Sequence, residues 1–370
     1  MSKAAELAAL IGSQDASNLT PNRNFIINGG MKVAQRSTST ASITGAGVFV
    51  IDRWEMDEAA DSTLTMSQET LTTGDAFDAG LKHSLKVLVT TADTSIGSSQ
   101  SVQLMQSIEA QNLQTLKFGS SGAKNLTLSF YYKSNVTGVH TVCIDKIDTT
   151  RTTCPLEFTV SSANTWERYT LNAVANSAVQ GSSGAIVNDN GAGFRVIWGL
   201  AYGSDYQSGT SGTWAQNGTA NFSTSNQQNI VGAADNYIEL TGVQLEIGDV
   251  ATSFEHEAFG TTLTKCQRYY LKYIDNAAYS DICNVAAYST SAARGVLDMP
   301  SRMRTAPTLT SSGAFQILGI GAVSSVSIST TGEESPVSIT LGGSGYTSAT
   351  GGVFRTNNDA DAYIELDAEL

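Results

Sequence analysis

The stretch GVQLEIGDVATSFEHE, from Gly242 to Glu257, decides how the chain is divided. In its first half, GVQLEIG, apolar residues alternate with Gln and Glu, which is the period of a strand with one buried face. The second half ends in Glu255, His256 and Glu257, which raises the question of a catalytic or metal-binding set. We interpret GVQLEIG as the closing strand of a sandwich. VATSFEHE is then the strap that carries the chain out of it, and its three charged or titratable residues are solvated or lie at an interface.

Short strand-like runs fill most of the chain before this stretch. They are joined by polar turns, and only 15% of all residues are charged and only five are proline. Such runs without intervening helices indicate an antiparallel β-sandwich of the jelly-roll type rather than a βαβ fold. The runs are VFVIDRW (48–54), SLKVLVTT (84–91), SVQLMQSIE (101–109), LTLSFYYKS (126–134), HTVCIDKID (140–148), LEFTVSS (156–162), WERYTLNAV (166–174), FRVIWGLAYG (194–203) and YIELTGVQLE (237–246).

Two segments change from the strand period to a helical one. Residues 2–11 have apolar side chains at helical spacing, and so short a helix needs a partner to be stable. After the strap, Leu263, Cys266, Tyr270 and Tyr273 recur at intervals of three and four, which predicts a linking helix. The sequence thus predicts an N-terminal helix and linker (1–20), a jelly-roll β-sandwich (21–258), a linking helix (259–275) and a smaller C-terminal β domain (276–370).

The acidic net charge of the chain indicates which classes of partner it can bind. Lys and Arg number 21 against 34 Asp and Glu, a net charge of −13. An acidic chain lacks the broad attraction to phosphates and anionic membranes that basic proteins have, so we expect no nucleic-acid partner and no membrane insertion. The N-terminus lacks the apolar core of a signal peptide. The four cysteines form no CxxC pair and are expected to be buried free thiols.

A search for catalytic chemistry finds no constellation. The three histidines, His83, His140 and His256, have no metal-ligand spacing, and neither a GxSxG elbow nor a Walker loop occurs. We therefore expect no enzyme and no metal centre. A polysaccharide depolymerase stays open, because the carboxylates that it needs cannot be paired from sequence. A structural Ca²⁺ near the Asn28 turn and Glu239 or Glu246 is a weak alternative, since no calcium-loop signature accompanies it.

The aromatic residues are the candidates for ligand binding. No Lys or Arg occurs between Arg195 and Lys265, and the Gly-rich polar segment within that interval is long for a connection in a compact domain. Tyr202, Tyr206 and Trp214 lie on or beside it. Sugar rings stack on such side chains, so these three are the predicted glycan-binding residues. Trp54, Trp166 and Trp198 stand in strand patterns and are expected in the core.

MSKAAELAALIGS (1–13) and PSRMRTAPTLTSSGAF (300–315) resemble fibre-type proteins of marine phages, and several further motifs in a fixed order resemble bacteriophage tail-fibre and minor structural proteins. They are NFIINGGMKVAQRS (24–37), DRW (52–54), LTLSFYYKS (126–134), WERYTL (166–171), GVQLEIGDVATSFEHE (242–257) and LTKCQRYY (263–270). The resemblance spans roughly residues 20–275, and the sandwich half is similar to jelly-roll carbohydrate-binding modules.

This resemblance implies a virion protein of the phage tail, assembled in the host cytoplasm. It further implies a homotrimeric tail fibre or receptor-binding protein that mediates adsorption to host surface glycans. The N-terminus would attach to other tail or virion proteins, and the part after the linking helix would be distal and face the host. The resemblance assigns no glycan-contacting residue. The alternatives are a capsid- or tail-decorating protein without a receptor role, and a depolymerase tailspike.

Overall fold

A computed structural model describes residues 23–216, 218–273, 277–329 and 336–370. The chain divides after Ala258 into two compact units, of which the second runs from Phe259 to Glu369. The predicted boundary near residue 260 falls at this division, whereas the helix predicted within residues 1–20 lies outside the described residues. In the described ranges, no helix is long and apolar enough to span a membrane.

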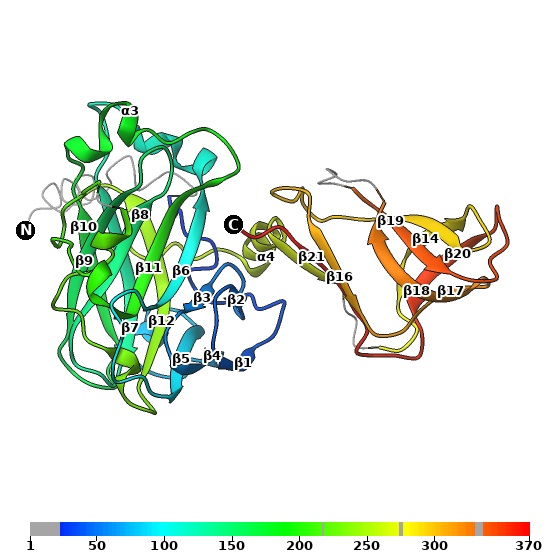
Figure 1. The fold of residues 1–370 in the computed structure, drawn as a ribbon, viewed down its shortest axis with the longest axis horizontal. Coiled ribbons are helices and arrows are strands. Elements are labelled where there is room, and N and C mark those ends of the chain that lie inside the picture. Colours follow the sequence, from blue (N-terminus) through cyan, green and yellow to red (C-terminus); the bar gives the residue numbers. More distant parts are fainter. Residues whose placement is uncertain (1–22, 217, 274–276, 330–335) are drawn as a thin grey trace, which may run out of the picture. The chain divides into compact units, whose positions relative to one another are not determined.

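The first unit contains two six-stranded sheets, and every strand pairing is antiparallel (Figure 1). Sheet A has the order β1 (Ser39–Ile43), β4 (Thr63–Thr70), β5 (His83–Thr91), β12 (Tyr237–Ile247), β7 (Leu126–Ser134) and β10 (Glu167–Ala173). Sheet B has the order β2 (Val48–Phe49), β3 (Glu55–Glu58), β6 (Ser101–Glu109), β11 (Ala192–Tyr202), β8 (Gly138–Lys146) and β9 (Thr152–Val160). The predicted antiparallel β-sandwich is confirmed.

Aromatic side chains from both sheets meet in the sandwich core. Phe130 of β7 in sheet A lies 5.5 Å from Trp198 and 5.2 Å from Phe158, both of sheet B, as edge-to-face pairs between ring centroids. Trp54 packs on Trp198 at 5.5 Å, and both indoles are buried, as their strand patterns predict. Trp166 is also buried, but in a smaller cluster with Leu71 outside this core.

Short helices and turns connect the strands of the sandwich. They are α2 (Asp75–Asp78), η2 (Ala110–Leu116), η3 (Ser177–Val179), α3 (Gly181–Gly184), η4 (Ser204–Tyr206), η5 (Gly218–Asn221) and η6 (Ile230–Gly232). The last three belong to the long polar segment between β11 and β12, which is packed against sheet B. Thr153 of β9 and Ala215 of this segment exchange two backbone hydrogen bonds of 3.0 Å.

The start of the described chain runs beside β12. In β12, the register shifts between Thr241 and Gln244, and Gly242 at this bulge has a φ of +60°. Beyond the bulge β12 pairs with residues 25–29 in place of β5. Phe25 N donates to Leu245 O at 2.9 Å, and Val243 N donates to the carbonyl oxygen of Gly29 at 3.0 Å. First and last parts of the sandwich are thereby joined, as a jelly roll predicts.

The second unit begins with α4 (Phe259–Gln267), followed by β13 (Tyr270–Tyr273). The prediction of one helix over 259–275 is therefore wrong at its C-terminal end. Tyr270 and Tyr273 belong to a strand, because YLKY pairs antiparallel with β21 (Tyr363–Asp367), which also pairs with β16 (Thr308–Ser312). A four-residue strand rich in tyrosine is compatible with the same apolar spacing as one helical turn.

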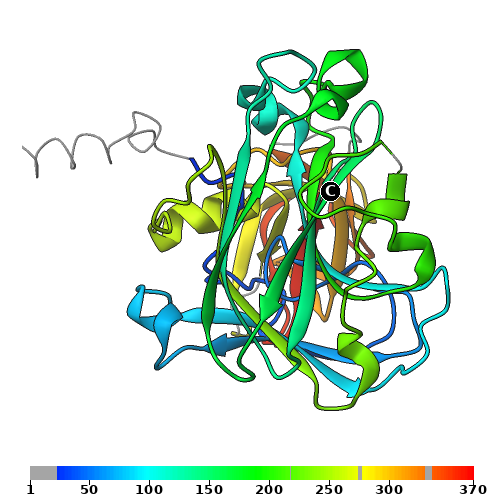
Figure 2. The same cartoon turned by 90° about the vertical axis from the view of Figure 1, so that its left-hand side faces the viewer.

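The rest of the second unit is a closed antiparallel barrel, drawn in yellow to red in Figures 1 and 2. Its core contains Phe354, Ile339 and Leu341, all fully buried. The barrel order is β14 (Asp281–Ala287), β15 (Ala292–Leu297), β19 (Val337–Gly343), β18 (Gly321–Ile328), β17 (Phe315–Leu318) and β20 (Gly351–Thr356). The four cysteines are free, and all but the half-buried Cys283 are buried.

Candidate functional site

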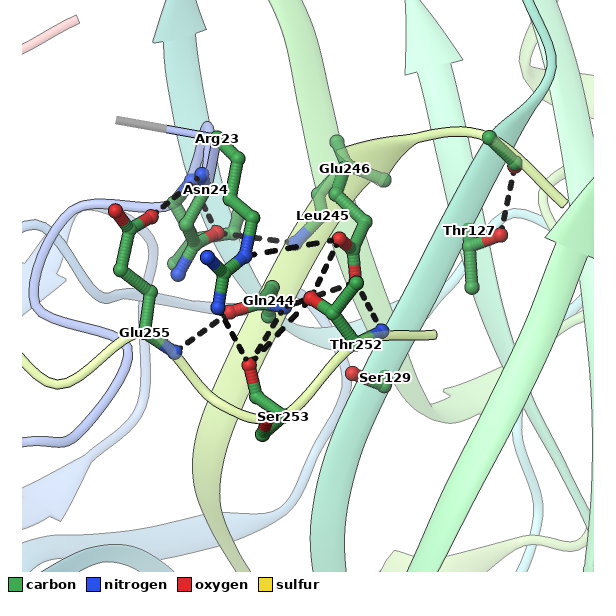
Figure 3. A network of polar contacts seen from close by, with 12 residues as sticks. Arg23, Asn24, Thr127, Ser129, Gln244, Leu245, Glu246, Thr252, Ser253 and Glu255 are labelled. Carbon is green, nitrogen blue, oxygen red and sulfur yellow. Dashed lines mark hydrogen bonds and ion pairs between the residues drawn. The ribbon is translucent and has the colours of Figure 1, made fainter. Parts of the chain in front are cut away.

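The strap after β12 is held by a network centred on Gln244 (Figure 3). The Gln244 amide nitrogen donates to Glu246 Oε1 and to Thr252 Oγ1, both at 2.8 Å, and its oxygen accepts from the backbone nitrogen of Glu255 at 2.8 Å. Thr252 Oγ1 donates in turn to Glu246 Oε2 at 2.7 Å. The polar residues that alternate along GVQLEIG therefore bind the strap to the sheet.

The Glu255–His256–Glu257 sequence extends the same packing. Glu255 Oε2 accepts from the backbone nitrogen of Asn24 at 3.1 Å, and His256 Nε2 donates to Ala79 O at 3.0 Å. The backbone oxygen of Glu257 accepts from Lys32 Nζ at 2.7 Å. The three residues contact different parts of the sandwich, and in the described part of the chain no group of His, Cys, Asp and Glu is arranged to hold a metal. We interpret Glu255, His256 and Glu257 as structural residues that hold the strap on the sandwich.

Asn28 has no capacity left for the calcium ion considered above. Its amide oxygen accepts from the backbone nitrogens of Lys32 at 2.8 Å and Val33 at 3.1 Å. Its amide nitrogen donates to the backbone oxygens of Val33 at 2.9 Å and Asp52 at 3.1 Å. An Asn side chain has two donors and two acceptor lone pairs, and all four are used here. The side chain stabilises the turn instead.

The predicted aromatic platform is wrong for two of its three residues. Tyr202 and Trp214 are 4% and 2% exposed, so neither presents a ring face to a ligand. Trp214 packs in the sandwich core, edge-on to Phe118. Tyr206 is half-buried; its ring stacks on Phe222 with an interplanar angle of 11°. Tyr202 and Tyr206 pack with Phe222 on the outer face of sheet B, whereas Trp214 lies in the core, and only Tyr206 stays a prediction.

Side chains of a different kind gather on the same outer face of sheet B. Glu55 and Asp57 of β3 alternate with Met56, which is buried in the core. The register places Asp57 beside Gln103 and Glu55 beside Met105 of β6. Arg195 of β11 pairs with Ser107, one row further along β6. We call Glu55, Asp57, Gln103 and Arg195 the sheet B polar face.

A chain of hydrogen bonds fixes one end of this face. Tyr202 Oη donates to Gln103 Oε1 at 3.3 Å, and Gln103 Nε2 donates to Asp57 Oδ2 at 3.2 Å. The buried phenol thus sets the orientation of the amide, and the amide in turn holds the carboxylate of Asp57. Tyr202, predicted as a ligand-stacking residue, is instead buried in a cluster with Met105 and Ile197 and orients Gln103 through its hydroxyl.

Burial governs the ionisation of the two carboxyl groups. It raises the pKa of Glu55, against the opposing charge of Arg195 and with the repulsion of Asp57. It also raises the pKa of Asp57, against the hydrogen bond from Gln103 and the charge of Arg195. Arg195 is thus electrostatically coupled to both carboxylates.

Two charged groups of the polar face lack a hydrogen-bond partner within the described residues. The Glu55 carboxylate accepts no hydrogen bond from the described residues, and the buried Nε of Arg195 has none either. A half-buried charged group without a partner is unfavourable unless water or a ligand satisfies it. The face therefore offers a guanidinium donor and carboxylate acceptors, with an aromatic ring nearby at Tyr206, while the buried Gln103 amide is used within the protein.

Sequence reasoning missed the residues of this face. The signal available was the EMDE pattern at 55–58, in which Glu55 and Asp57 lie on either side of the apolar Met56 in a short strand. Arg195 lies within a run interpreted only as a core strand. Their proximity depends on the pairing of β3 and β11 with the same strand, β6, which the sequence does not reveal.

No protein-family model and no curated protein sequence matches the chain. Among solved structures, it is similar to the enzymatically active domain of tailspike protein 4 of bacteriophage CBA120, with 13% identity and a TM-score of 0.30, covering 62% of this chain and 22% of that one. It is also similar to a CBM4 module (13% identity, TM-score 0.30, 60% and 98% covered). A family 11 carbohydrate-binding module of Clostridium thermocellum matches with 12% identity and a TM-score of 0.29, covering 58% and 97%. The chain spans about a fifth of the tailspike structure's length.

Proposed function

We propose that the chain is a carbohydrate-binding protein that holds a saccharide on the sheet B polar face. The observation that carries this proposal is the pair of unfilled groups, the Glu55 carboxylate and the Arg195 guanidinium, on one face of the sheet. Saccharide hydroxyls are both donors and acceptors, so a neighbouring carboxylate and guanidinium can engage them together.

Each residue has a distinct role in this proposal. Glu55 and Asp57 accept hydrogen bonds from hydroxyl groups, and Arg195 donates to ring or hydroxyl oxygens. Gln103, held by Tyr202, keeps Asp57 in place and is a positioning residue. Tyr206, half-buried beside Phe222, offers an apolar surface for a sugar C–H face at the margin of the site.

We further propose that the protein binds without hydrolysing its ligand. Glycoside hydrolysis uses two carboxyl groups on opposite sides of the scissile bond. Glu55 and Asp57 instead stand two residues apart on one strand and point to the same side of sheet B. Incubation with purified polysaccharide should release no new reducing ends, and their release would contradict this part of the proposal.

The biological role that we propose is adsorption of a phage tail fibre to host surface glycan, in the virion. Support comes from the ordered motifs between residues 20 and 275 and from two β units in one chain. Weak saccharide contacts become effective when several copies act together, which a homotrimeric fibre attached through its N-terminus would provide. Labelling of virions with an antibody against the protein tests this role, and absence of label from the tail would contradict it.

The binding site is tested with matched variants. We expect the full chain to bind a host polysaccharide in calorimetric titration, with Glu55→Gln and Arg195→Met each lowering the affinity about tenfold, the loss of roughly one charged hydrogen bond. Arg294→Met is the control, because Arg294 is an exposed arginine that lies over the Tyr288 ring in the second unit. Unchanged affinity in the Glu55→Gln, Arg195→Met double variant would overturn the site.

A further inference from the structure

The outer face of sheet A carries a second arrangement of charged and aromatic side chains. Glu239 of β12 lies directly opposite Lys86 of β5 on one side and Lys133 of β7 on the other. The three residues therefore form one row across the middle of the sheet. The next row along β12 begins with Tyr237, whose cross-strand partner is Leu88.

Both lysines approach the same ring. Lys86 Nζ lies 4.8 Å and Lys133 Nζ lies 5.8 Å from the centroid of Tyr237. The ring itself is fixed, because its hydroxyl donates to Asn164 Oδ1 at 2.7 Å and the backbone nitrogen of Tyr237 donates to Asn135 Oδ1 at 2.8 Å. The tyrosine is half-buried, so part of it stays open to solvent.

The two lysines differ in how their charge is compensated. Lys133 Nζ forms an ion pair with Glu239 Oε1 at 2.8 Å, and Ser84 Oγ donates to the other oxygen of the same carboxylate at 3.2 Å. Lys86 has no ion pair within the described residues, only its contact with the Tyr237 ring. Lys86 is thus the lysine of this row without an ion pair, while the second carboxylate of this face, that of Glu69 in β4, accepts from Ser67 Oγ at 2.6 Å.

Smaller side chains complete the surface around Lys86. The β4–β5 register places Ser67 beside Lys86 and Thr65 beside Leu88, and all four are half-exposed. The surface therefore combines an ammonium group, the Thr65 hydroxyl, an aliphatic side chain and a fixed aromatic ring, with the Ser67 hydroxyl donated to Glu69 Oε1. An anionic group would gain the ammonium charge, while an apolar ring face would gain contact with Tyr237 and Leu88.

We propose that this face of sheet A is a binding site for acidic saccharides, with the anionic substituent on Lys86 and the sugar ring against Tyr237. It is separate from the sheet B polar face, because it lies on the other sheet of the sandwich and faces away from the shared core. The proposal does not depend on the first site. The unpaired ammonium of Lys86 favours an acidic over a neutral sugar here, since Glu239 is paired with Lys133 and Glu69 is hydrogen-bonded by Ser67, whereas on the sheet B polar face two carboxylates stand beside one arginine.

The experiment titrates the full chain with an oligogalacturonate, with a neutral oligosaccharide of equal length and with inorganic sulfate, followed by calorimetry. We expect the oligogalacturonate to bind with an affinity that falls as salt is added, and Lys86→Gln to lower it about tenfold. Tyr237→Leu should lower it as well, and Tyr237→Phe should retain it. Lys82→Gln is the matched control, since Lys82 Nζ lies 3.7 Å from the Phe77 ring centroid but is exposed away from this row.

The outcomes separate this proposal from the first one. The loss caused by Lys86→Gln should be the same in the natural chain and in a Glu55→Gln background, so failure of the sheet B site does not affect the result. Absence of oligogalacturonate binding, or equal losses in Lys86→Gln and Lys82→Gln, would overturn the site. Equal binding of sulfate alone would show an anion site without sugar recognition, and equal binding of the neutral oligosaccharide would remove the role of charge; either result contradicts the proposal.

Discussion

Glu55 of β3 and Arg195 of β11 lie on one face of sheet B with β6 between their strands, and neither the Glu55 carboxylate nor Arg195 Nε has a hydrogen-bond partner among the described residues. The positive charge of Arg195 acts on the Glu55 carboxylate, and polar groups of this kind can be bridged by water or a ligand. The relationship distinguishes this part of the surface from the strap, where the polar groups of Gln244 and Glu246 are satisfied within the protein.

Saccharide binding should depend on pH through the two carboxyl groups. Burial raises the pKa of Glu55 above 4.5 and that of Asp57 above 3.8, their ordinary values. As the pH falls, these groups are protonated earlier than exposed carboxylates, and each then loses its negative charge and acceptor capacity. We expect affinity to be constant at neutral pH and to decrease as the pH falls through the raised pKa values.

The measurement is a series of calorimetric titrations between neutral and mildly acidic pH, with folding monitored by circular dichroism. The Glu55→Gln, Asp57→Asn variant should bind more weakly at neutral pH and show a flatter pH dependence. An equal pH dependence in the variant and the natural chain would contradict the assignment of these two carboxylates to the site.

His140 should make the sandwich less stable in acid. Its Nδ1 accepts from Tyr132 Oη at 2.9 Å and its Nε2 donates to Val136 O at 3.0 Å. The imidazole is therefore neutral in the folded protein. Burial lowers its pKa from 6.5 to about 4. Between these values the unfolded chain binds a proton that the folded chain does not, so stability is lost as the pH falls from 6.5 towards 4, by about 3 kcal/mol in total.

Urea unfolding at several pH values tests this prediction. His140→Gln removes the titrating group, so the difference in unfolding free energy between the natural chain and the variant should shrink as the pH is lowered. A difference that stays constant from about pH 7 to about pH 4.5 would show that His140 does not titrate in this way.

Asn28 should be among the most sensitive polar residues of the sandwich. Its side chain makes four hydrogen bonds and its φ is +59°, a conformation that Asn and Gly tolerate better than other residues. Asn28→Ala loses the bonds and adds strain, so we expect a destabilisation of about 3 kcal/mol. Asn28→Gly loses only the bonds and should cost less. Equal stability of Asn28→Ala and the natural chain in urea unfolding would contradict this role.

Gly242 at the β12 bulge should not accept a side chain. A Cβ there would lie 2.7 Å from Leu81 Cδ1 and 2.9 Å from Tyr131 Cδ2, at a φ of +60°. Gly242→Ala should therefore lower the thermal midpoint, with a cost of about 1–3 kcal/mol. Gly45→Ala is the control within the same unit, because a methyl group added to Gly45 would meet no atom within 4 Å and the φ of Gly45 is not positive. Equal midpoints for the two variants would contradict the steric argument.

Much of the sandwich could be predicted because its strands have local signals. LTLSFYYKS alternates so that Phe130 and Tyr132 enter the core, and the structure places both there. Local patterns were less informative where a helix and a short strand fit the same spacing of apolar residues. Leu263, Cys266, Tyr270 and Tyr273 fit one helical face, yet the helix ends at Gln267 and YLKY pairs with β21, since a strand partner almost one hundred residues later outweighs the local period.

The candidate site illustrates the other limit. Trp214 stands in a polar, glycine-rich segment that is typical of an exposed loop, but its indole fills a space beside Phe118 and Phe194 in the core. Glu55 and Arg195 are 140 positions apart and meet only because their strands flank β6. Neither the burial of one nor the proximity of the others has a signal within a short window of sequence.

The sequence by itself determined the fold class, the closing strand at GVQLEIG and the approximate end of the sandwich, since side-chain alternation and turn residues act over a few neighbouring positions. Only the tertiary structure decided that Gln244 and Glu246 bind the strap, that the Tyr202 hydroxyl orients Gln103, and that Lys86 and Lys133 share one ring. Those outcomes depend on strand order and register. Both are set by long-range burial of the whole core and by closure of long loops, which no local pattern records.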